Sequence, residues 1–123
     1  MNLKQFLTES KKSQVNDFLK FAKEYLNLSS TPKIIVIDDP NFSAVNKTFG
    51  CFELDNNTIK VQVAQRHPMD IYRTLAHELV HYKQKEDGKE MNGDDGSDIE
   101  NEANAVAAVL LRQYSQRIPN HGY

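Results

Sequence analysis

The residues best suited to chemistry in this chain are two histidines one helical turn apart. Residues 77–81 read HELVH, so on a helix His77 and His81 lie on one face and can hold one metal ion between them. Glu78 lies about 100° further around that helix, beside the position of a water at the metal. The pattern predicts a metal site with Glu78 as general base. The alternative is a pair of solvent-facing histidines on an amphipathic helix.

A third ligand must come from elsewhere, because a catalytic zinc site has three protein ligands and one open position. On a helix over residues 98–117, Glu100 shares a face with apolar residues, whereas Glu102 points about 200° away. We therefore expect Glu100 to be the ligand and Asn104, one turn later, to hold the outer nitrogen of a ligating histidine. Two alternatives stay open: Glu100 closes a capping box that starts at Ser97, or Glu102 takes its place at the metal.

Peptide hydrolysis at such a site also needs a hydrogen-bond donor for the developing oxyanion. Chemistry alone gives five candidates and does not rank them, namely Tyr72, Tyr82, Tyr114, His67 and His121. The acidic residues 94–98 do not have the alternating spacing of a calcium loop, so we expect a solvated loop there. Cys51 is the single cysteine and has no partner for a disulfide; we expect it to be a small apolar filler in a strand.

The elements that must position these residues follow from hydrophobic spacing and from turn-forming residues. We expect helices over residues 3–28, 67–86 and 98–117, strands over 33–37, 49–54 and 58–64, and an acidic loop over 86–97. The first helix has an alternative break near Ser13. Together these segments predict one α+β domain over residues 1–123, with a three-stranded sheet above the HELVH helix. Residues 58–64 would form the cleft edge and pair with an extended substrate.

Composition excludes several classes of partner. The 123 residues carry 15 Lys and Arg against 17 Asp and Glu, a net charge of −2 that gives no field for attracting nucleic acid. The sequence contains no apolar run of the roughly 20 residues that a membrane helix needs, and no signal-peptide pattern at its start. We therefore expect no nucleic-acid or membrane partner and a cytoplasmic location.

The HELVH segment, followed after eighteen residues by ENEANAVAAVLL, resembles the minimal gluzincin metallopeptidases, in particular the small family that cleaves phage and stress-response repressors. The resemblance covers roughly residues 59–111. It implies a zincin-like fold, one zinc ion on His77, His81 and Glu100, Glu78 as general base, and a protein or peptide substrate. The chain departs from the family pattern at Val80, where a small residue is common, and lacks the Met-Pro that often follows the Leu-Leu pair.

Two further readings concern the role of the whole protein. The same three ligands would also suit a structural zinc in a non-catalytic binding protein, or in a virion-associated protein that has lost activity. The N-terminal residues MNLKQFLTES resemble the capsid-targeting peptides of large tailed phages. That resemblance implies cleavage between Glu9 and Ser10, removal of residues 1–9, and a phage-encoded protein that is packaged in the head after synthesis in the host cytoplasm.

Overall fold

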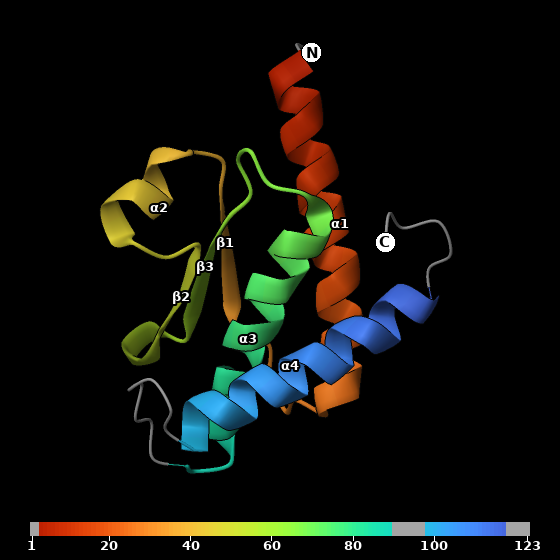
Figure 1. Ribbon diagram of the computed structural model, residues 1–123, viewed down its shortest axis with the longest axis vertical. Helices are drawn as coiled ribbons and strands as arrows, with labels where there is room; N and C mark the ends of the chain where they lie inside the picture. The colour runs from red at the N-terminus through yellow and green to blue at the C-terminus, as the bar shows by residue number, and fades with distance from the viewer. Residues whose placement is uncertain (1–2, 90–97, 118–123) are drawn as a thin grey trace.

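The computed structural model describes residues 3–89 and 98–117, with side chains from residue 12 onward in these ranges. This part of the chain is an α+β structure with four α-helices and a small three-stranded mixed sheet, which confirms the predicted fold class (Figure 1). In chain order the elements are α1 Leu3–Leu26, β1 Lys33–Ile37, α2 Asn41–Asn46, β2 Gly50–Glu53, a 3-10 turn at Leu54–Asn56, β3 Thr58–Gln62, α3 Pro68–Glu86 and α4 Asp98–Arg117.

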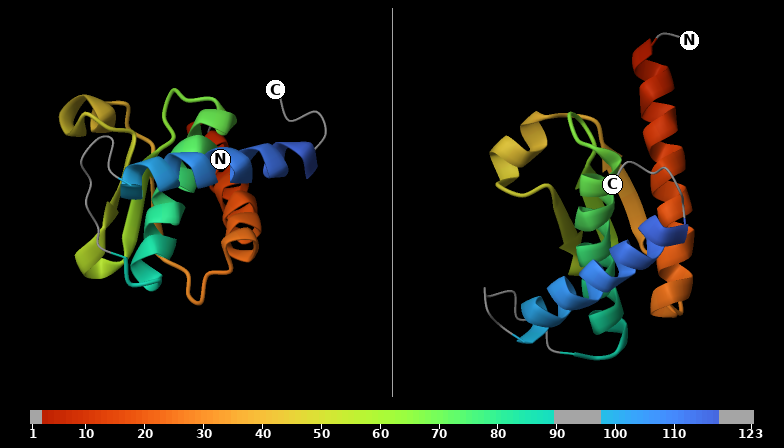
Figure 2. Two further views of the ribbon diagram at one scale, coloured as in Figure 1. Left: turned by 60° about the horizontal axis from the view of Figure 1, so that its bottom comes forward. Right: turned by 45° about the vertical axis from the view of Figure 1, so that its right-hand side comes forward.

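The helix that carries HELVH lies at the centre of the molecule. One side of α3 packs against β2, β3 and α1, and α4 crosses its other side, so that α3 lies between the sheet and α4 (Figures 1 and 2). The residues of α3 that were expected to face away from the histidines are all nearly inaccessible, at 4% exposure or less; they are Ile71, Tyr72, Leu75, Ala76, Leu79 and Tyr82. The amphipathic pattern thus fixes the rotation of α3 about its axis.

The sheet has the strand order β1-β3-β2, with β1 parallel and β2 antiparallel to β3. The predicted hairpin is confirmed: Asn57 adopts a left-handed conformation with φ of 50° directly after the 3-10 turn. Ile59 and Val61 of β3 are completely buried and face the helices. Both strands of the hairpin are shorter than predicted, because pairing begins at Gly50 and β3 ends at Gln62.

The first helix ends before the proline that was expected to stop it. Asn27 adopts a left-handed conformation with φ of 55°, and the Leu28 N–H donates to the Lys23 carbonyl oxygen at 3.1 Å, the bond that ends many helices. The helix thus ends at Leu26, two residues before the predicted end near Leu28. The helix runs without a break through Ser13, and its first turns, residues 3–10, extend away from the other elements (Figure 2).

The short helix α2 was missed by sequence reasoning. It carries no buried residue, so it lacks the apolar periodicity on which the other helices were recognised. It is held instead by polar contacts: the Asp39 side chain accepts from Asn41 N–H at 2.9 Å, and the Gln62 side-chain oxygen accepts from Ser43 N–H at 2.8 Å.

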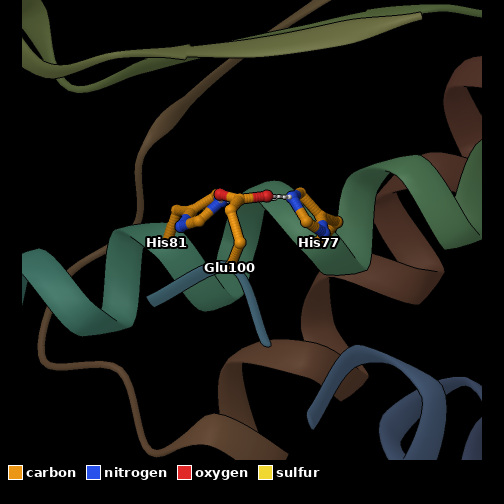
Figure 3. A group of neighbouring side chains, drawn as sticks. All are labelled: His77, His81 and Glu100. Carbon is orange, nitrogen blue, oxygen red and sulfur yellow. Dashed lines mark hydrogen bonds and ion pairs between the residues drawn. The ribbon is translucent and has the colours of Figure 1, made fainter. Parts of the chain in front are cut away.

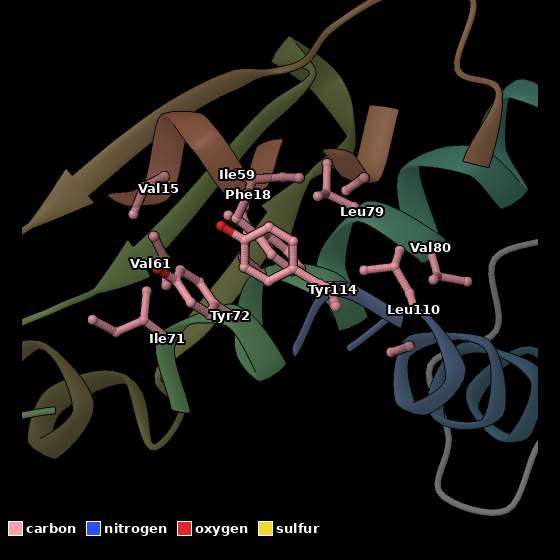
Figure 4. Close-up of a cluster of buried hydrophobic side chains, with 14 of the residues drawn as sticks. Val15, Phe18, Ile59, Val61, Ile71, Tyr72, Leu79, Val80, Leu110 and Tyr114 are labelled. Atoms are coloured by element: carbon pink, nitrogen blue, oxygen red, sulfur yellow. The ribbon is translucent and has the colours of Figure 1, made fainter. Parts of the chain in front are cut away.

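The core is formed where α1, α3 and α4 meet. The Phe18 ring stacks on Tyr72 at 4.9 Å between centroids and meets the edge of Tyr114 at 4.9 Å (Figure 4). Each such pair adds about 0.5–1.5 kcal/mol beyond the area it buries. On α4, Leu110 is fully buried and Leu111 only partly, so the buried face of this helix is centred closer to Leu110 than to Leu111. No helix in the described ranges is long and apolar enough to cross a membrane.

Candidate metal centre

The crossing of α3 and α4 brings together the three residues that were predicted as metal ligands. His77, His81 and Glu100 each offer one donor atom, and these atoms all lie within 4.8 Å of one another. Figure 3 shows the Glu100 side chain extending from α4 to a point between the two imidazoles of α3. Within the described part of the chain, no other cluster of at least three histidine, cysteine or acidic side chains has this geometry.

Glu100 contacts both histidines directly. Its Oε2 lies 2.7 Å from His81 Nε2 and its Oε1 lies 3.2 Å from His77 Nε2, while the two Nε2 atoms are 3.1 Å apart. The side chains of His77, His81 and Glu100 are 27%, 10% and 19% exposed, so the cluster is largely shielded but open on the His77 side. The Glu100 carboxylate therefore faces the imidazoles. Ser97, the start of the alternative capping box, lies outside the described residues.

Gln84 holds the outer nitrogen of His81 and was not predicted. Its side chain is 1% exposed; its Nε2 donates to the Ile99 carbonyl oxygen at 3.1 Å and to Glu102 Oε1 at 2.7 Å. Because the amide N–H groups are used in this way, the Gln84 Oε1, 2.8 Å from His81 Nδ1, must accept from that nitrogen. A neutral His81 therefore carries its proton on Nδ1 and directs a bare Nε2 toward Glu100.

Glu102 supports this arrangement rather than replacing Glu100. Its two carboxylate oxygens each lie 2.7 Å from the Lys89 ammonium, and one also accepts from Gln84. The hydrogen bonds from Lys89 and from Gln84 lower the pKa of Glu102. Glu102 therefore stays charged and anchors the amide that orients His81.

Asn104 lies where the sequence placed it, one turn after Glu100. Its side chain hydrogen bonds to His77. Burial lowers the pKa of His77, and the neighbouring His81 lowers it further, against smaller opposite effects of Glu100 and Asn104. Both influences favour the neutral imidazole, which is the form that binds metals.

The chemistry of this donor set fits a divalent metal ion. Two imidazole nitrogens and a carboxylate converge, and with the imidazole protons on the outer nitrogens all three present lone pairs that a cation can bind. Tetrahedral ligands about 2.0–2.1 Å from zinc are about 3.3 Å apart. The two Nε2 atoms, 3.1 Å apart, and Glu100 Oε2, 2.7 Å from His81 Nε2, lie close to that spacing. Nitrogen donors favour zinc and other transition metals over calcium or magnesium, which prefer oxygen.

Glu78 lies beside the donors and toward the sheet. It lines a cleft of about 240 Å³ together with His77, and its Cγ would be 3.8 Å from a Cβ at Gly50 on β2. The pKa of Glu78 is raised to about 7, chiefly by burial, with smaller effects of His81, which lowers it, and of Glu100, which raises it. A carboxylate in this position can exchange a proton near neutral pH.

The described candidates for an oxyanion donor all lie elsewhere. Tyr72 and Tyr114 are buried in the aromatic core, and Tyr82 hydrogen bonds to Ser30 and packs against a β2 ring. His67 caps α3, where its Nδ1 accepts from Met69 N–H at 3.1 Å. His121 and most of the acidic segment over 94–98 lie outside the described residues. Besides His77, the side chains at the cleft that could donate are Arg73 and Thr74, about one turn before His77 on α3, and Thr48, which precedes β2.

The strand expected to form the cleft edge is the central strand of the sheet. β3 pairs with β1 on one side and β2 on the other, so it has no free side for a substrate. The expectation was wrong because nothing in the sequence showed that β1 pairs in parallel with β3. The edge strand beside α3 is β2. Gln62 N–H donates to Phe49 O, and in this antiparallel register Phe52 turns its backbone N–H and C=O to the outer side.

Cys51 is half-buried on β2, and burial raises the pKa of its thiol. This agrees with a packing role for that residue.

Comparison of the chain with protein-family models, with curated proteins and with solved structures found no match, so the geometry of the donors and of their surroundings is the basis for assigning a function.

Proposed function

We propose that this chain is a zinc-dependent metallopeptidase with a zincin-like fold, which hydrolyses peptide bonds of a protein or peptide substrate. The observation that carries the proposal is the convergence of His77, His81 and Glu100 at one point, beside a partly buried Glu78 that lines the adjacent cleft. These three residues would hold the zinc ion, which when bound supplies a Lewis acid that polarises the scissile carbonyl and acidifies water.

Glu78 is the general base in this proposal. Its carboxylate accepts a proton from the water that attacks the carbonyl carbon, and then passes the proton to the nitrogen of the leaving amine. A pKa near 7 suits both transfers at neutral pH. A structural zinc site is closed by its ligands and has no use for a base beside an open position, so Glu78 favours an enzyme over a binding protein.

The outer side of β2 offers a place for an extended substrate. The backbone N–H and C=O of Phe52 point away from β3 and can pair with a peptide strand. The Gly50 carbonyl already accepts from the Thr48 hydroxyl at 2.9 Å, so pairing would centre on Phe52. A substrate on this edge would run beside α3 and across the face that carries Glu78.

The first test is the metal itself. Protein purified without an affinity metal should contain about one zinc per chain by elemental analysis, and should cleave members of a random peptide library. A chelator should stop cleavage, and added zinc should restore it. Cleavage that persists after complete metal removal, or protein that binds no transition metal, would contradict the proposal.

The second test separates catalysis from metal binding. Glu78→Gln should keep one metal per chain and lose at least about 100-fold in cleavage rate, since it removes only the base. Glu100→Ala should lose metal affinity most strongly, Glu102→Ala less because it acts through Gln84, and the exposed Glu24→Ala on α1 not at all. Zinc bound by the wild type with no cleavage of any peptide would favour the non-catalytic alternative.

A further inference from the structure

The cleft beside the metal donors continues along α3 toward its N-terminus. Its volume of about 240 Å³ is below the 300–1,000 Å³ typical of small-molecule sites, so it suits one side chain or one chain end of a longer ligand. Its lining residues are Thr48, Phe49, Arg73, Thr74, His77 and Glu78. Arg73 and Thr74 precede His77 and Glu78 by one turn, about 5.4 Å along the helix axis.

A second arginine fixes the wall of the cleft. The Arg66 guanidinium lies 4.1 Å from the centre of the Phe49 ring and donates to Thr74 Oγ1 at 2.9 Å. It also donates to the backbone oxygens of Gln62 at 3.2 Å and Asp70 at 2.9 Å. Phe49 and Thr74 are thus joined through one half-buried cation, which holds the two sides of the cleft at a set separation.

Among the side chains that line the cleft, Arg73 is the one that carries a permanent positive charge. Both threonine hydroxyls bond within the protein: Thr48 to the Gly50 carbonyl at 2.9 Å, and Thr74 to the Asp70 carbonyl at 3.2 Å. The Arg73 side chain is 55% exposed, and its Nη1 contacts Asp70 Oδ1 at 2.7 Å. A guanidinium has five N–H donors, so it can bind a second carboxylate alongside Asp70.

We propose that this cleft binds a carboxylate of the peptide substrate through Arg73, with Phe49 as the opposite wall. The carboxylate would belong to the residue next to the scissile bond, because Arg73 is one turn from His77 and lines the same cleft as Glu78. This inference rests on the proposed peptidase function and specifies its substrate class. The carboxylate has two sources, an internal Asp or Glu side chain or a free C-terminus.

The experiment compares matched peptides in cleavage and in binding. One pair of blocked peptides differs only by Asp against Asn at one position, and a second pair differs only by a free against an amidated C-terminus. Cleavage is followed with the zinc-loaded wild type, and binding with zinc-loaded Glu78→Gln, which is expected to hold peptide without cutting it. We expect the carboxylate member of one pair to be favoured by about 10-fold or more in kcat/KM and in affinity, and the favoured pair identifies the source.

The matched control is Lys83→Gln. Lys83 is also a cation of α3 paired with a neighbouring aspartate, Asp87 at 3.3 Å, but it does not line the cleft. Arg73→Gln should abolish the carboxylate preference, Arg73→Lys should keep part of it, and Lys83→Gln should leave it intact, with all three proteins unchanged in circular dichroism and metal content.

Equal cleavage and equal affinity within both peptide pairs would overturn the carboxylate assignment while leaving the peptidase intact. So would a preference that survives in Arg73→Gln. Binding that selects the carboxylate and depends on Arg73, without cleavage of any peptide by the wild type, would overturn the peptidase and keep the cleft as a carboxylate site.

Discussion

At the scale of single residues, Gln84 shows how a neutral side chain controls the metal donors. It lies on the same face of α3 as both histidines, seven residues after His77 and three after His81, and α4 buries it. Its amide connects His81 to Ile99 and Glu102, so it fixes the tautomer of the imidazole and the start of α4 together. A buried amide of this kind is costly unless all of its hydrogen bonds are made.

We expect Gln84→Met to weaken zinc binding by about 10–100-fold while the protein stays folded, because His81 loses the acceptor that orients it. The exposed Gln113→Met on α4 is the matched control and should bind zinc as the wild type does. Competition against a zinc-binding dye measures both affinities. Wild-type affinity in a folded Gln84→Met would show that the Nδ1 contact does not position the ligand.

Glu78 gives a pH dependence in the metal-free protein. Burial raises its pKa from 4.5 to about 7, so between these values the folded chain holds a proton that the unfolded chain has lost. The free energy of unfolding therefore falls as the pH rises through this interval. Glu78→Gln cannot ionise; we expect it to match the wild type at about pH 4 and to exceed it by about 1–3 kcal/mol at about pH 8.

Denaturant unfolding in chelator at both pH values measures this difference. His77 is present in both proteins, so its own titration largely cancels in the comparison. A stability gap of the same size at the two pH values would contradict the assignment, because a gap that is independent of pH reports packing and not ionisation.

The sequence revealed the residues whose role depends on local spacing. HELVH sets the two histidines on one face by helical geometry alone, and the inward face of the last helix selects Glu100 over Glu102. Gln84 was missed although it lies on the histidine face, because its role appears only when α4 supplies Ile99 and Glu102 as partners. The carboxylate-binding residue proposed above, Arg73, was missed for a similar reason: the cleft exists only once Phe49 packs beside α3.

At the scale of elements, β2 lies close to α3 at the positions of Gly50, Thr74 and Glu78. A Cβ at Gly50 would lie 2.6 Å from Thr74 Cγ2 and 3.1 Å from the Lys60 carbonyl oxygen. The first distance is too short for carbon and the second is tight, so a side chain at this position would push the strand from the helix. Gly50 is therefore needed for its lack of a side chain.

We expect Gly50→Ala to lower the free energy of unfolding by about 1–3 kcal/mol through overpacking. It should also reduce cleavage, since β2 and Glu78 would move apart. Cys51→Ala, the next residue of the strand, is half-buried and should cost less. Chemical denaturation of the two variants measures this difference. A free energy of unfolding that is unchanged in Gly50→Ala would mean that the strand shifts to accept the methyl group at no cost in stability.

Helices in which apolar residues recur at helical spacing were predicted well, whereas features that depend on polar or long-range contacts were not. α3 and α4 were located to within one residue at each end, since each has a buried stripe and clear end signals. α2 has no buried face and depends on Gln62, nineteen residues from its contact at Ser43. The central position of β3 in the sheet could not be predicted either, because parallel pairing with β1 has no local sequence signal.

At the scale of the whole molecule, the donors join two helices that are far apart in the chain. Two come from α3 and one from α4, and α3 also packs on the sheet and α1, so a bound ion would tie the last helix to the centre of the fold. Ligand binding to the folded state alone stabilises it by about 4 kcal/mol at 1,000 times the dissociation constant.

We therefore expect saturating zinc to raise the Tm by about 10–15 °C. Magnesium should have little effect, because two of the three donors are imidazole nitrogens. Glu100→Ala should lose most of the shift, and thermal scans with and without each ion measure it. An equal shift in Glu100→Ala would place the stabilising ion away from the donors described here.

The distance along the chain between the two histidines and Glu100 has a consequence during synthesis. A ribosome releases α3 well before α4, so a nascent chain displays the histidine pair without its carboxylate. Complete coordination must wait until residue 100 has emerged and its helix has docked. The order of translation therefore prevents three-ligand coordination at every stage before α4 is available to dock on α3.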